Sequence, residues 1–159
     1  MWVFDDGGRE AAAYRGKADD CVTRAIAIAT GVPYGIVYGE LMAAQEAWLS
    51  NQRRSKRQKL TRSGNRRSAS PRDGVMREVY EPWLINLGWV WTPTMRVGSG
   101  CTVHLTPDEL PAGKIICRVS KHMVAVIDGV AHDTYDPTRD GTRCVYGYFQ
   151  EQSWGNDDD

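Results

Sequence analysis

Long apolar runs are absent from this 159-residue sequence. The longest stretch without Asp, Glu, Lys or Arg covers residues 25–39, and Gly31, Pro33 and Gly35 interrupt it. A transmembrane helix needs about 20 consecutive apolar residues, so we expect neither a membrane-spanning segment nor a membrane partner. With 42% hydrophobic and 25% charged residues, the composition is that of a soluble globular protein.

Cysteine is scarce as well. Four Cys in a chain of this length are too few for a disulfide scaffold. Residues 1–8 contain neither the basic leader nor the apolar run of a secretory signal, so we expect a cytoplasmic protein with reduced thiols. A functionally special Cys is therefore expected to be a nucleophile or a ligand rather than half of a disulfide.

Acidic residues are missing from one long segment. The chain has 20 Lys+Arg and 20 Asp+Glu, yet residues 51–72 contain nine basic residues and no acidic one. This composition predicts a surface arm inserted into a single domain of residues 1–156, followed by an acidic tail at 157–159. Such an arm is usually solvated or docked on an acidic partner, and it can also neutralise nucleic-acid phosphates, although it lacks aromatic residues on which bases could stack. The basic residues available for nucleic-acid or partner binding are Arg53, Arg54, Lys56, Arg57, Lys59, Arg62, Arg66 and Arg67.

Helical spacing of apolar residues dominates the first half of the chain. The sequence predicts a helix that begins near Cys21, with Asp19 or Asp20 as its cap, and that ends at Gly31. Two further helices are predicted from about Tyr34 through Leu49, with an extension into the arm left open, and from about Val75 to Leu87, with a kink or break at Pro82.

Short apolar strands with Pro- and Gly-containing turns follow. The layout predicts an α+β fold with an antiparallel sheet. A one-turn helix with a capping box is predicted at 106–109. The predicted strands are Trp89–Thr92, Thr102–Leu105, Lys114–Val119, Met123–Ile127, Val130–Thr134 and Cys144–Phe149.

Cys21 is the first candidate for chemistry, because it lies where a loop becomes a helix. The unpaired amides and the positive dipole end at that position favour a thiolate. Asp19 and Asp20 oppose this effect, so activation needs a base or cation from elsewhere in the chain.

A predicted hairpin can supply that base. Asp128-Gly129 is suited to a type I′ turn, and pairing around it places Asp133 on the face of His122, one diagonal away. Asp136 reaches that face only if a bulge precedes Pro137. Cys21, His122 and Asp133 or Asp136 then provide a nucleophile, a base and an orienting acid.

These residues carry a resemblance to a known family. A Cys at the start of the first helix, followed by His and Asp on later strands, resembles the papain-like cysteine peptidase superfamily. Asp20-Cys21 is similar to the Asp-Cys of its NlpC/P60 branch, and Asp136-Pro137 to the Asp-Pro of its peptidase C39-like branch. Over about residues 14–149, the segments DCVTRAIAIATG, HMVAVIDG, HDTYDP and VYGYF look like uncharacterised papain-like proteins of bacteriophages and bacteria.

The resemblance implies a papain-like fold in which the nucleophile helix packs on the C-terminal sheet. It also implies a cofactor-free, Cys-dependent hydrolase or acyl transferase acting on amide, peptide or isopeptide bonds of a peptide or protein. The sequence departs from papain where the oxyanion Gln would stand, in residues 14–20. Tyr14 and Lys17 are therefore candidate donors beside the Cys21 amide.

Other interpretations stay open at this point. Cys21 and His122 could be buried structural residues, since both types often serve only in packing or hydrogen bonding. Cys101 with His104, and Cys117 with His122, have ligand types suited to zinc but no compact spacing. A non-enzymatic phage accessory or virion protein that keeps this fold and binds through its basic arm is the alternative function.

Overall fold

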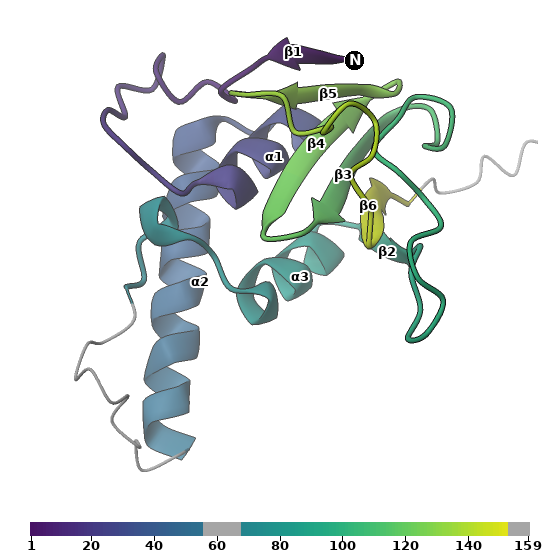
Figure 1. The fold of residues 1–159 in the computed structure, drawn as a ribbon. Helices are drawn as coiled ribbons and strands as arrows, with labels where there is room; N and C mark the ends of the chain where they lie inside the picture. The colour runs from purple at the N-terminus through teal and green to yellow at the C-terminus, as the bar shows by residue number, and fades with distance from the viewer. Residues whose placement is uncertain (56–67, 153–159) are drawn as a thin grey trace, which may run out of the picture.

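The fold consists of helices packed on one mixed sheet. A computed structural model describes residues 1–55 and 68–152 (Figure 1). Within these ranges the helices are α1 (Cys21–Thr30), α2 (Tyr34–Ser55), α3 (Arg77–Asn86) and a 3-10 helix η1 (Pro71–Asp73). The strands are β1 (Trp2–Phe4), β2 (Trp89–Pro93), β3 (Lys114–Val119), β4 (His122–Ile127), β5 (Val130–Asp133) and β6 (Gly147–Glu151). The expected α+β class is confirmed.

The strands form one sheet in the order β1-β5-β4-β3-β6-β2. Strands β2 to β6 pair in antiparallel fashion, as predicted, but β1 pairs in parallel with β5. The sequence analysis missed β1, because three residues are too few to show the alternation that reveals a strand. Through β1, the N-terminal segment lies beside the end of the hairpin that carries His122 and Asp133 (Figure 1).

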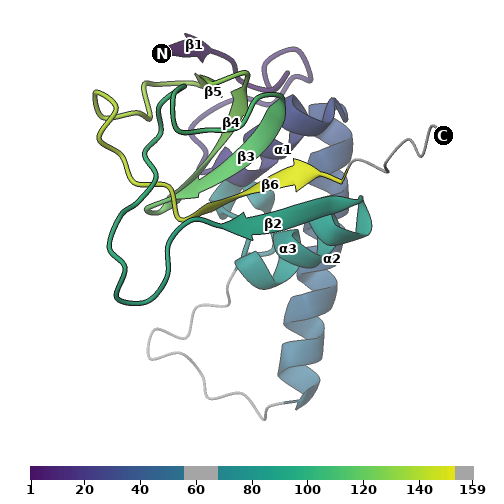
Figure 2. The same ribbon diagram turned by 90° about the vertical axis from the view of Figure 1, so that its right-hand side faces the viewer.

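Each face of the central strands packs against a different layer. Ile116 of β3 and Ala125 of β4 pack on the helices, whereas Cys117 and Val124 pack in a second cluster with Leu105. The alternation follows from the two-residue period of a strand. Figure 2 shows the helices on one side of the sheet and the long loops on the other.

The helix boundaries follow local signals in the sequence. Gly31 ends α1 in the left-handed conformation, with φ 74°, and its N–H donates to the carbonyl of Ala27. Helix α2 continues to Ser55, which confirms the extension into the arm. Helix α3 runs through Pro82 without a break, so the predicted split is wrong. No helix in the described part of the chain is long and apolar enough to cross a membrane.

The hairpin between β4 and β5 has the predicted turn. Asp128 and Gly129 have φ of 49° and 80°, and Val126 pairs with Ala131 in the expected register. These positive angles are those that a type I′ turn requires.

Three local predictions are wrong. Residues 102–105 contribute only an isolated bridge between His104 and Cys144, and the last strand begins at Gly147 rather than Cys144. Residues 106–109 form a turn, not a helix, although Thr106 does donate its hydroxyl proton to Glu109.

The expectation of four reduced thiols is also wrong. Cys101 and Cys144 form a disulfide, which links the loop after β2 to the segment before β6. Cys144 is half-buried rather than part of the core. Two Cys 43 residues apart gave no spacing signal from which this pairing could be inferred.

The described ends of the basic arm are ordered parts of the fold. Residues 51–55 belong to α2, and Arg72 of η1 donates to the carbonyls of Arg15 and Lys17. The side chains of Arg53 and Arg54 and all of residues 56–67 lie outside the described part. The nucleic-acid or acidic-partner role of the arm therefore stays a prediction.

Gly147 provides a test of how β2 and β6 pack. A Cβ at this position would lie 2.8 Å from the carbonyl oxygen of Thr92 and against the ring of Trp91. We expect Gly147→Ala to lower the free energy of unfolding by about 1–3 kcal/mol, as overpacking does. Urea denaturation followed by circular dichroism measures the change.

Gly39 of α2 is the matched control, because no atom lies within 4 Å of a Cβ built there. We expect Gly39→Ala to raise the free energy of unfolding by about 0.5–1 kcal/mol, since alanine favours the helix. Equal effects of the two substitutions would contradict the packing assigned to Gly147.

Candidate active site

Cys21 is the first residue of α1 and is half-buried. The amides of a first helical turn have no intrahelical acceptor, so their N–H groups and the helix dipole favour a negative charge there. Helix α1 packs on β4, which brings this end of the helix to the start of that strand (Figure 1).

His122 and Asp133 meet at the same end of the sheet. His122 begins β4 and Asp133 ends β5, and the two strands are antiparallel neighbours. His122 Nε2 lies 2.6 Å from Asp133 Oδ2, and both side chains are buried. The predicted pairing of His122 with Asp133 is thus present in the structure.

Asp136 does not take part in this contact. Its Oδ1 accepts hydrogen bonds from the Thr138 amide and hydroxyl, at 2.9 and 2.7 Å, and its side chain is exposed. These bonds lower the pKa of the Asp136 carboxyl. The structure therefore places one of the two candidate acids, Asp133, beside His122.

Cys21 and His122 line the same cavity, and each shifts the pKa of the other. Burial raises the pKa of the Cys21 thiol, but the hydrogen bond and charge of His122, with a main-chain hydrogen bond from Met123, outweigh it and leave the pKa below its usual value. Burial lowers the pKa of His122, whereas its bonds to Asp133 and Cys21 raise it, to about 9 in balance. Each shift favours the charged form of its group, which is the direction expected for a thiolate–imidazolium pair.

Arg24 is a buried residue of the site that the sequence analysis missed. It lies one turn after Cys21 and donates to Asp20 and to Asp133 Oδ1, the latter at 3.3 Å. Asp133 therefore has a partner on each oxygen, His122 on one and Arg24 on the other. The spacing of Asp20 and Arg24 by four residues was the available signal.

Asp20 is the N-cap residue of α1, as one of the two predicted alternatives had it, but its side chain does not cap the helix. Its carboxylate makes no capping hydrogen bond and instead accepts from Arg24 and, at 2.6 Å, from the Tyr34 hydroxyl. Burial and this bond raise the pKa of Tyr34. An unpaired Asp20 carboxylate would disfavour a thiolate at Cys21. The positive charge of Arg24 balances that carboxylate.

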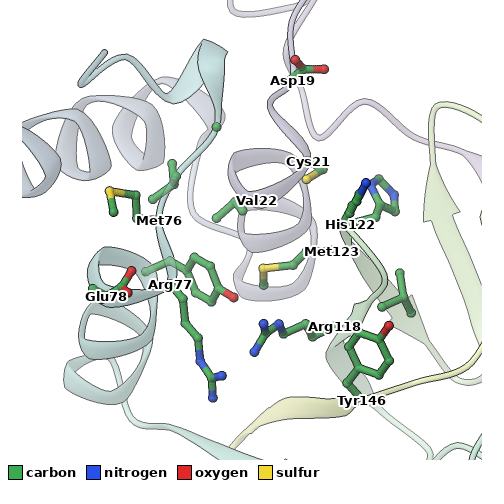
Figure 3. A pocket seen from close by; sticks show the side chains of 15 residues that line it. Asp19, Cys21, Val22, Met76, Arg77, Glu78, Arg118, His122, Met123 and Tyr146 are labelled. Carbon is green, nitrogen blue, oxygen red and sulfur yellow. The ribbon is translucent and has the colours of Figure 1, made fainter. Parts of the chain in front are cut away.

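A cavity of about 500 Å³ adjoins Cys21 and His122. Figure 3 shows both residues at its upper edge, with α3 and β3 on opposite sides of the space below them. Charged residues of both signs line it, so it differs from a closed apolar pocket. They are Asp19, Arg77, Glu78, Arg118 and Lys121.

The two predicted oxyanion donors lie elsewhere. Tyr14 packs against the rings of Tyr34 and Tyr38 and lines a different cavity. Lys17 is exposed, and its carbonyl accepts from Arg72. Neither residue lines the cavity beside Cys21. Of the three oxyanion donors predicted from the sequence, the amide of Cys21 is the remaining candidate.

The Cys and His residues considered as zinc ligands do not come together in the structure. Cys101 is in the disulfide and Cys117 is fully buried, where burial raises its thiol pKa. His104 contacts Glu109, and His132 is half-buried and lies 3.0 Å from Asp5 Oδ2. Among the described residues, no group of three or more His, Cys, Asp or Glu is placed to hold a metal ion.

Comparison with models of protein families, with curated proteins and with solved structures returned no match.

The two candidate acids can be separated by substitution. We expect Asp133→Asn to slow alkylation of Cys21 by iodoacetamide about tenfold near pH 6, because a weaker base at His122 leaves less thiolate. Asp136→Asn should change the rate less than about twofold. Mass spectrometry of the labelled peptide gives both rates, and circular dichroism checks the fold of each variant. A larger effect of Asp136→Asn would contradict this geometry.

Proposed function

We propose that this protein is a Cys-dependent hydrolase or acyl transferase of papain-like architecture that acts on an amide, peptide or isopeptide bond. The observation that carries the proposal is that Cys21 and His122 line one cavity and that His122 Nε2 lies 2.6 Å from Asp133 Oδ2. A nucleophile, a base and an orienting acid in this order are the elements of a catalytic triad.

In the proposed acylation step, the Cys21 thiolate attacks the substrate carbonyl carbon and forms a C–S bond, and the carbonyl electron pair moves to oxygen. We assign the first-turn amide of Cys21 as the donor to that oxygen. When the C–N bond breaks, the His122 imidazolium gives its proton to the leaving amine, which departs neutral.

In the second step, His122 takes a proton from water, or from an acceptor amine, and this nucleophile attacks the thioester. The C–S bond breaks, the electron pair returns to sulfur, and Cys21 is again a thiolate. Asp133 stays ionised throughout, since it orients the ring and stabilises the imidazolium while Arg24 holds its other oxygen.

The proposal is tested with p-nitrophenyl acetate, an activated ester that needs no knowledge of the natural substrate. We expect the protein to release p-nitrophenol in a burst and to carry an acetyl thioester on Cys21, visible by intact-protein and peptide mass spectrometry. Cys21→Ala should abolish both signals.

Cys117→Ala is the matched control, since Cys117 is a thiol buried in β3 away from the cavity. It should keep the burst and the adduct. Undiminished p-nitrophenol release by folded Cys21→Ala, or acetylation elsewhere than Cys21, would refute the proposed mechanism.

A further inference from the structure

Arg118 occupies a fixed position in the cavity that contains Cys21. It lies in β3, between its pairing partners Met123 of β4 and Gly147 of β6, so its main chain is hydrogen-bonded into the middle of the sheet. Its side chain is on the same face as Ile116, which packs on the helices. In Figure 3 it extends from β3 into the space below Met123 and Cys21.

The guanidinium of Arg118 lacks an acidic partner. Among the residues that the structure describes, no carboxylate lies within ion-pair distance of it, although Asp19 and Glu78 line the same cavity. The side chain is half-buried, which strengthens its interaction with any anion that enters. Five N–H donors are therefore held beside the candidate nucleophile without a charged acceptor.

Arg77 shows what a satisfied arginine in this cavity looks like. Its Nε donates to Glu81 Oε2 at 2.6 Å, and its guanidinium carbon lies 5.6 Å from the centre of the Trp91 ring. The charge of Arg77 is thus already balanced within α3, whereas that of Arg118 is open to a ligand.

Two tyrosines, Tyr80 and Tyr146, line the cavity together with Arg118. Its positive charge lowers the pKa of Tyr80, although burial dominates and leaves that pKa raised, so the phenol stays protonated. Tyr146 lines the same cavity, and its backbone N–H donates to the Arg118 carbonyl at 2.9 Å. Arg118 can bind a planar anion through paired hydrogen bonds, because a guanidinium presents its N–H donors in a planar fork.

We propose that Arg118 binds a carboxylate of the substrate and so makes this cavity select acidic substrates. The inference rests on the proposed role of Cys21, and it names the substrate class of that site. Two sources could supply the carboxylate: the side chain of an acidic residue next to the scissile bond, or a free chain terminus.

Three alkylating probes distinguish these sources and need no natural substrate. The α-amide of N-iodoacetylglutamate carries a side-chain carboxylate, N-iodoacetylglutamine carries an α-carboxylate, and the α-amide of N-iodoacetylglutamine is neutral. In each case the Cys21 thiolate forms a C–S bond and displaces iodide. The second-order rate of each reaction at Cys21 is measured by peptide mass spectrometry at neutral pH.

We expect the native protein to react roughly tenfold faster with one anionic probe than with the neutral probe. A charge-assisted hydrogen bond between Arg118 and the probe would account for a difference of this size. The faster anionic probe identifies the source of the carboxylate. Arg118→Gln should abolish this preference, taken as the ratio of the anionic to the neutral rate in the same variant, and Arg118→Lys should keep part of it.

Arg77→Gln is the matched control, because it removes one positive charge from the same cavity. It should leave the preference within about twofold of the native value, since Arg77 is already paired with Glu81. The comparison separates a specific Arg118 contact from the general attraction of an anion to a positive cavity.

The failures of the two proposals are distinguishable. Fast reaction of Cys21 with all three probes at equal rates would overturn the carboxylate subsite and leave the nucleophile intact. An anionic preference that survives Arg118→Gln in a folded variant would also overturn it. Reaction of Cys21 no faster than a free thiol with every probe would overturn both proposals.

Discussion

The two-sided contact of the Asp133 carboxylate is the interaction on which the candidate site depends. One oxygen contacts His122 and the other Arg24, and all three side chains are buried. Removal of one partner from a buried ion pair costs roughly 3–5 kcal/mol, because the remaining charge stays away from water. Since Arg24 is on α1 and His122 on β4, this carboxylate joins α1 to the hairpin.

The balance of charge around Asp133 explains how a thiolate is stabilised among carboxylates. Asp20 and Asp133 provide two negative charges, and the Cys21 thiolate adds a third. Arg24 and the His122 imidazolium provide two positive charges, and Arg9, 3.4 Å from Asp20, provides another. The helix dipole adds to this balance at Cys21. An ionised Cys21 would make the charges of these six groups sum to zero.

Local patterns predicted the helix that begins at Cys21, the hairpin turn and the contact of His122 with Asp133, because each depends on short-range spacing. The patterns could not predict β1, the Cys101–Cys144 disulfide or the contact of Arg24 with Asp133. Those features join segments far apart in the chain, and a single sequence contains no direct record of such proximity. The same limit applies to Tyr14 and Lys17, which precede Cys21 in the sequence but turn away from its cavity.

The central claim is that Cys21 and His122 form a thiolate–imidazolium pair at neutral pH. The most direct test is a pH titration of the ultraviolet absorbance of the thiolate, taken as the difference between the native protein and Cys21→Ser. We predict that Cys21 ionises well below the pKa of about 8.5 of a free thiol, and that His122→Ala moves this ionisation upward by more than one pH unit. A Cys21 titration at or above the free-thiol pKa, unchanged in His122→Ala, would contradict the account.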